Sequence, residues 1–148
     1  MDAIETLEKD HDRIRSLFSE FNETNDSQEL QDCFDKIGNI LTIHAEAEEQ
    51  VLYPEAINCE GTEELIAKGH QDHDKGDRMV LELKSISPSE SQFKQKVKEL
   101  QSFMLAHLDE EENDLFPKVR QGMDDRKLEQ LAKEIKQTKA EVAPKVVD

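Results

Sequence analysis

Apolar residues recur at steps of three and four along most of the chain, which is the spacing of one face of an α-helix. Clusters of turn-forming residues at positions 22–27, 58–62, 85–91 and 121–125 divide the pattern into segments. The segments are long and their connections are short, so the pattern predicts an all-α protein, an antiparallel up-down four-helix bundle over residues 1–121. A short extra helix is expected over 126–139, with a mobile tail over 140–148, so residues 122–148 form a C-terminal extension.

Helix starts and stops add detail to this prediction. Asp2, Asp26 and Ser87 precede apolar segments and are followed three residues later by Glu, so we expect each to cap a helix. Proline inside a helix removes a backbone donor and collides with the preceding turn. Pro54 and Pro117 are therefore expected to kink or end the second and fourth helices.

Composition narrows the class of protein. The 148 residues include 35 acidic and 19 basic side chains, giving a net charge of −16, which argues against nucleic-acid or anionic-membrane partners. No apolar run is long enough to span a membrane, no signal peptide is visible, and Cys33 and Cys59 are too few for a disulfide framework. We therefore expect a reduced, soluble protein of the cytoplasm. A mean hydropathy of −0.80 would suggest disorder, but the helical stripes favour a folded core.

An internal repeat relates the two halves of the chain. Residues 44–54 read HAEAEEQVLYP and residues 107–117 read HLDEEENDLFP. The triplet Asp-His-Asp occurs around His11 and again around His73, at nearly the same separation. The repeat predicts two helical hairpins related by a pseudo-two-fold axis.

The repeated residues place polar chemistry on apolar faces. A His and a Glu stand four positions apart at His44 and Glu48, and again at His107 and Glu111, so each pair shares a helix face with the apolar stripe. Burying unpaired imidazoles and carboxylates costs several kcal/mol for each group, on the order given by transfer data. A metal cluster would satisfy all of them together, and a carboxylate can bridge two metals.

A hydrogen-bonded polar core without metal is the alternative, but four such histidines in a repeat favour metal binding. The candidate metal ligands are His11, His44, Glu48, His70, His73, His107 and Glu111. His70 stands at the edge of its stripe and is either a ligand or a solvated neighbour. The other acidic residues of the repeat, including Glu49 and Glu112, are expected on solvated faces, with orientation of the ligands as the alternative. Tyr53 and Phe116 are expected in the core.

These motifs resemble those of the hemerythrin-like, HHE cation-binding family, over about residues 3–119. The resemblance implies a bundle that encloses two non-haem iron ions joined by an oxygen bridge, with histidines at each iron and two bridging carboxylates. Under that resemblance the iron ligands are His11, His44, Glu48, His73, His107 and Glu111.

Two positions depart from the oxygen-carrying hemerythrins. The carriers have His-x-x-x-His on the third helix, whereas position 69 is Gly here and the additional histidine is His70. The carriers also have Asp five residues after the last His, a place held here by Glu112, with Glu111 one position earlier. The Glu111 pattern is more similar to bacterial and regulatory members, so reversible oxygen carriage is not the first expectation.

Three functions remain at this point. The first is a di-iron protein that binds or senses dioxygen, nitric oxide or peroxide. The second is a peroxide-removing or iron-donating protein of oxidative stress and repair, and whether the chain is an enzyme stays open. The third is an iron-responsive interaction module with an unidentified protein partner. A zinc-only structural site is disfavoured because such sites are closed and usually contain Cys.

Overall fold

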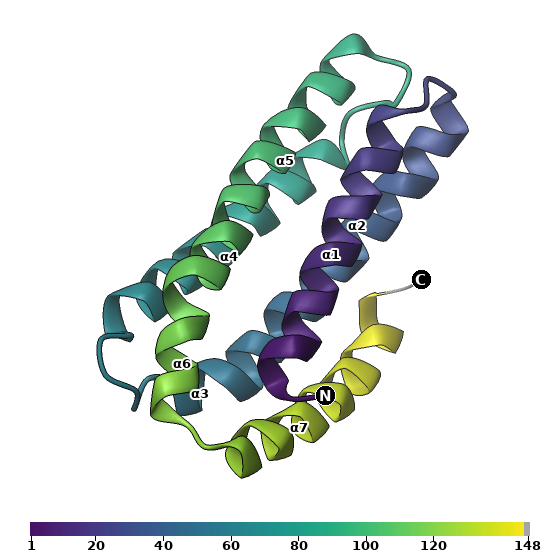
Figure 1. Ribbon diagram of the computed structural model, residues 1–148. Coiled ribbons are helices and arrows are strands. Elements are labelled where there is room, and N and C mark those ends of the chain that lie inside the picture. Colours follow the sequence, from purple (N-terminus) through teal and green to yellow (C-terminus); the bar gives the residue numbers. More distant parts are fainter. Residues whose placement is uncertain (147–148) are drawn as a thin grey trace.

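The computed structural model describes residues 1–146, and every element in that range is helical. The long helices of the bundle are α1 (Ala3–Asn22), α2 (Ser27–Ala47), α4 (Glu63–Leu83) and α5 (Ser91–Glu110). Helix α1 packs on α2 and α4 packs on α5 as antiparallel neighbours (Figure 1). The all-α, four-helix prediction is confirmed. None of the described helices is both long and apolar enough to cross a membrane.

Two of the three predicted helix caps, Asp2 and Asp26, are confirmed, and the prediction that Ser87 caps a helix is wrong. Asp2 accepts a hydrogen bond from the Glu5 backbone and its own N–H donates to the Glu5 side chain, which is a complete capping box. Asp26 likewise caps α2. The Ser87 hydroxyl instead bonds Ser89 in a local turn, and α5 begins later, at Ser91. The serine turn competes for the hydroxyl that the cap would have used.

The two prolines do not end their helices. Helix α2 continues through the π-helical turn η1 (Glu48–Leu52) into α3 (Tyr53–Ala56). Helix α5 continues in the same way through η2 (Glu111–Leu115) into α6 (Phe116–Gly122). In each case the wide turn ends two residues before the proline, in the stretch where a regular turn would meet the pyrrolidine ring. The prediction that the prolines end these helices is therefore wrong, and the distortion before each proline is a widened turn that begins at a buried glutamate.

Helix α7 (Asp125–Val146) is longer than the short helix predicted over 126–139. The tail expected from residue 140 is helical as far as Val146, and residues 147 and 148 lie outside the described part. The predicted stripe Leu128, Leu131 and Ile135 is buried, in one cluster with Leu7 and Phe116. Figure 1 shows α7 along the outside of the bundle beside the start of α1, and it packs against α1 and α2.

Two apolar cores divide the length of the bundle. Leu7 and Leu115 belong to the core that includes α7, whereas Ile14 and Leu108 belong to the core at the opposite end. The candidate ligand His11 lies between Leu7 and Ile14 along α1. The candidate ligands thus form a polar layer enclosed by apolar packing on both sides.

Candidate metal centre

Each helix of the bundle contributes one buried histidine to the polar layer. These are His11 from α1, His44 from α2, His73 from α4 and His107 from α5. Glu48 and Glu111 are the first residues of η1 and η2 and are buried beside them. The widened turns therefore begin at the two glutamates, a placement typical of π-turns at functional sites.

The six side chains form two overlapping groups, each compact enough to hold a metal ion. Within each group the possible ligand atoms all lie within 4.8 Å of one another. Glu48 and Glu111 belong to both groups. The first group adds His11 and His44, and the second adds His73 and His107. Two shared carboxylates with two histidines on either side could hold two metal ions, one in each group.

Nitrogen and oxygen lone pairs converge at the centre. The Nε2 atoms of His11 and His44 are 3.2 Å apart, and the His11 Nε2 is also 3.2 Å from Glu111 Oε1. In the second group the His73 Nε2 is 3.1 Å from Glu48 Oε1. Such inward-facing acceptors repel one another unless protons or cations lie between them.

Three atoms of the same centre are buried without a hydrogen-bond partner in the described part of the chain: Glu48 Oε2, His107 Nε2 and Glu111 Oε1. Leaving a buried polar atom unpaired costs about 1–3 kcal/mol, and more for a charged group. Coordination to a cation would satisfy all three. The donor set of imidazoles and carboxylates therefore fits a pair of metal ions better than a metal-free polar core.

Four carboxylates hold the outer nitrogens of the histidines. The Nδ1 atom of His11 is 2.6 Å from Glu112, and that of His73 is 2.6 Å from Glu49. A carboxylate accepts from Nδ1–H, so Nε2 is left unprotonated, with its lone pair directed toward the centre. The expectation of merely solvated Glu49 and Glu112 is wrong, and the alternative, orientation of the histidines, describes both.

The other two histidines are held by aspartates that sequence reasoning did not assign. The Nδ1 atoms of His44 and His107 are each 2.9 Å from a carboxylate oxygen, of Asp10 and Asp72 respectively. Each aspartate directly precedes a histidine in sequence but binds a histidine of the neighbouring helix. The recurrence of the Asp-His-Asp triplet was the signal available for finding them.

Positively charged side chains contact three of the four outer carboxylates. The Lys139 ammonium, from α7, is 2.5 Å from Asp10, and the Lys68 ammonium, from α4, is 3.0 Å from Asp72. The Arg15 guanidinium is 2.9 Å from Glu112. Charge thus alternates outward from the centre at three of the four outer carboxylates.

The pseudo-two-fold symmetry is broken by one hydroxyl. Phe116 stacks on His11 with ring centroids 5.6 Å apart, and Tyr53 stacks on His73 at 5.8 Å. Both rings are buried, as expected. The Tyr53 hydroxyl additionally donates a hydrogen bond to Glu111 Oε2 at 2.9 Å. The ring beside His73 therefore carries a neutral hydrogen-bond donor that reaches a shared carboxylate, and the Phe116 ring beside His11 has no such group.

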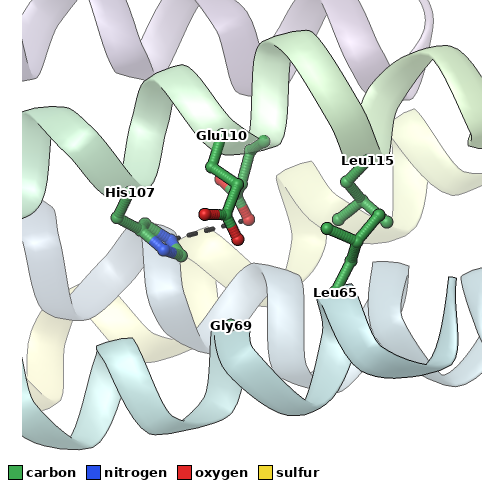
Figure 2. A pocket seen from close by; sticks show the side chains of 6 residues that line it. Leu65, Gly69, His107, Glu110 and Leu115 are labelled. Atoms are coloured by element: carbon green, nitrogen blue, oxygen red, sulfur yellow. Dashed lines mark ion pairs between the residues drawn. The ribbon is translucent and has the colours of Figure 1, made fainter.

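Gly69 provides the space for that hydroxyl. A Cβ atom at this position would lie 2.4 Å from the Tyr53 oxygen, which is closer than real contacts allow. A cavity of about 10 Å³, the scale of a single water molecule, adjoins Gly69 and is also lined by Leu65, His107 and Leu115. Figure 2 shows His107 and Glu110 above Gly69, with Leu65 and Leu115 to one side, and its dashed line marks the ion pair between His107 and Glu111.

His70 lies outside both groups. Its side chain is 48% exposed, its Nδ1 is 3.6 Å from Glu49, and its ring meets the edge of Tyr53. A position three residues before His73 is rotated by about 60° from it around a helix, and here that rotation carries the side chain to the rim. The geometry brings together six of the seven predicted ligands and gives the His70 ligand prediction no support.

The centre attracts protons in the absence of a cation. Burial lowers the pKa of His44, but the Glu48 charge and the Asp10 contact outweigh it, and the pKa lies well above its usual value. Burial likewise lowers the pKa of His73, yet contacts with Glu48 and Glu111 raise it to about 9. Burial raises the pKa of Glu48, and the His44 charge reverses this and brings it well below normal. Protons and metal ions therefore compete for the same atoms.

Comparison with known proteins identifies the family. The sequence model of the hemerythrin HHE cation-binding domain family matches residues 2–119. A DNA nickase from Nostoc sp. is 34% identical over 145 residues, covering 96% of this chain and 40% of that protein, so the chain spans less than half of its relative. The crystal structure of an HHE cation-binding domain-containing protein from Mycobacterium kansasii superposes with a TM-score of 0.84 at 26% identity, covering 99% of this chain and 92% of that one. The chain belongs to the hemerythrin HHE cation-binding domain family.

Proposed function

We propose that the protein holds two iron ions and through them binds or senses a small ligand, namely dioxygen, nitric oxide or peroxide. The observation that carries the proposal is the pair of overlapping ligand groups with Glu48 and Glu111 common to both. Imidazole and carboxylate together suit iron, and two iron ions supply two electrons for exchange with an oxygen-containing ligand.

The protein's own side chains prepare this centre. The four outer carboxylates fix the imidazole tautomers, so Nε2 is presented without reorganisation. The Tyr53 hydroxyl holds one orientation of Glu111. With four histidines rather than five, two bound irons would have an additional coordination position for a ligand, which would favour reaction or sensing over the single terminal site of a carrier.

The surroundings restrict what can reach the centre. The cavity at Gly69 adjoins His107 and Glu111 and holds about one water-sized molecule, with leucine side chains on its wall. A diatomic molecule or peroxide is of this size, whereas an organic substrate is not. This size limit supports a small-ligand function.

Metal analysis with visible spectroscopy tests the proposal. We expect about two irons per chain, because each ligand group holds one ion, and a charge-transfer band that changes with air, nitric oxide or peroxide. Glu48→Gln should lose both the bound metal and the charge-transfer band. His70→Ala, a change at the rim outside both ligand groups, should retain both. Equal metal content in wild type and Glu48→Gln would reject the proposal.

Peroxide removal is the second candidate, favoured by the four-histidine count. Gas release and rapid peroxide loss from the iron-loaded protein would support it, and stoichiometric consumption would support sensing. DNA nicking, named for the Nostoc relative, is not part of our proposal because a net charge of −16 opposes binding to a polyanion. A plasmid-relaxation assay checks this directly. Free Cys33 and Cys59 fit our proposal of a reducing, cytoplasmic setting.

A further inference from the structure

A groove between the start of α1 and the outer helix α7 has a volume of about 580 Å³. Figure 1 shows the amino-terminal end of α1 beside α7 at this place. Small-molecule sites commonly enclose about 300–1,000 Å³. The groove is therefore of a size for a compact organic molecule, and it lies outside the metal centre.

Lysines dominate the lining of this groove. They are Lys9 from α1 and Lys133, Lys136 and Lys139 from α7, against the single acidic side chain Glu129. Lys9, Lys133 and Lys136 form no ion pair within the part of the chain that the structure describes, although acidic residues outnumber basic ones 35 to 19. Neighbouring ammonium groups repel one another, and an anion between them relieves that repulsion.

The groove also offers apolar surface. Ala132 and Met1 also line the groove, and the aliphatic stems of the lysines add further methylene surface. An anionic head beside an apolar body matches this combination. A long polyanion is a poorer match, because the protein beyond the groove carries a strong negative charge.

We propose that the α1–α7 groove binds a compact organic anion, with a carboxylate or phosphate head on an apolar body, and that this anion shares Lys139 with Asp10. The Lys139 ammonium contacts Asp10, and Asp10 in turn holds His44. An occupant of the groove therefore meets the outermost charge of one half of the metal centre. The equivalent Lys68, on Asp72 and His107, does not line the groove.

The anion site does not depend on the proposed iron function, and its test needs no metal-dependent activity. Isothermal titration of the purified protein uses decanoate and AMP as probes of the two head groups, with decanol and adenosine as neutral analogues. We expect at least one anion to bind about tenfold more tightly than its neutral analogue, a difference of about 1.4 kcal/mol.

Paired lysine variants locate the binding. Lys133→Ala/Lys136→Ala should weaken binding of that anion about tenfold, since two charge-assisted contacts are removed. Lys84→Ala/Lys98→Ala removes the same charge at exposed positions away from the groove and should change affinity less than about twofold. Failure of both anions to bind, or equal losses in the two double variants, would overturn the proposal.

The sharing of Lys139 has its own test. Asp10→Asn removes the carboxylate that competes for Lys139, so anion affinity should rise severalfold. Asp72→Asn makes the same change in the other half of the centre and should leave affinity unchanged. Thermal melting of both variants confirms that each is folded before titration. An equal response of the two variants would show that Lys139 is not shared.

Discussion

The two halves of the metal centre share a plan but differ in their surroundings. Both have two histidines, each held by an outer carboxylate, and both include Glu48 and Glu111. Beside His11 the aromatic ring is Phe116, and the position four residues before His11 is Leu7, in the same core. Beside His73 the ring is Tyr53, and the position four residues before His73 is Gly69.

The differences at positions 53 and 69 depend on each other sterically. A leucine-sized side chain at position 69 would occupy the place of the Tyr53 hydroxyl, so the hydroxyl and the glycine require each other. The hydroxyl then polarises Glu111 on the His73 side only. A repeat that places two similar groups of candidate ligands is thereby made asymmetric by one hydroxyl.

The largest expected effect comes from removing a carboxylate that both halves share. Glu111→Leu should reduce metal content from about two ions per chain to less than one, because each position loses a ligand and a charge. Metal analysis after desalting measures this. Glu110→Leu, the neighbouring residue outside both ligand groups, is the matched control and should keep its metal. Retention of both ions in Glu111→Leu would mean that the glutamate is not a shared ligand.

Substitution of Gly69 tests the packing that separates the halves. Gly69→Ala should destabilise the fold by about 1–3 kcal/mol, because the new Cβ overlaps the Tyr53 hydroxyl in a close-packed core. Gly38→Ala provides the control, since its Cβ would make only ordinary contact at 3.5 Å and should be neutral or stabilising by about 0.5–1 kcal/mol. Denaturant midpoints distinguish the two. Similar midpoints for both variants would contradict the packing described for Tyr53.

The sequence predicted the parts of this centre that depend on helical periodicity. His44 with Glu48, and His107 with Glu111, share a face because four residues make slightly more than one turn. Contacts between helices were harder to foresee. Asp10 contacts a histidine of the next helix rather than its sequence neighbour, and no spacing within α1 encodes that contact.

The error at Ser87 and the length of α7 have similar causes. A local serine turn outcompeted the cap, although the residue types were suitable for either. Helix α7 extends past residue 139 because Thr138 is buried and Lys139 contacts Asp10, so contacts with the bundle support a segment with weak apolar periodicity. The role of Gly69 was visible only as a departure from the carrier pattern. Its physical meaning required the position of the Tyr53 hydroxyl.

The metal-free protein should lose stability as the pH rises. The folded-state pKa of His73, about 9, lies above the ordinary value of 6.5, so its stabilising contribution is complete below pH 6.5 and is lost as the pH rises through 9. Denaturant midpoints of chelator-treated protein at pH 6.5 and 9 measure the loss. Protein loaded with metal should show a smaller change, because the cation replaces the proton. A midpoint that increases between these pH values would contradict the assignment.

The smallest expected effect comes from making the two halves alike. Tyr53→Phe removes the hydroxyl that donates to Glu111 at 2.9 Å and lies 3.5 Å from Glu48, and it should cost about 1 kcal/mol of stability, the net contribution of a typical hydrogen bond. It should also release the less tightly held metal ion faster during chelator challenge, because Glu111 is no longer fixed on the His73 side. Phe116→Leu alters the ring on His11 without touching a polar contact and is the matched control in the other half. If both variants released metal with the same biphasic time course as the wild type, the hydroxyl would not be what makes the two positions unequal.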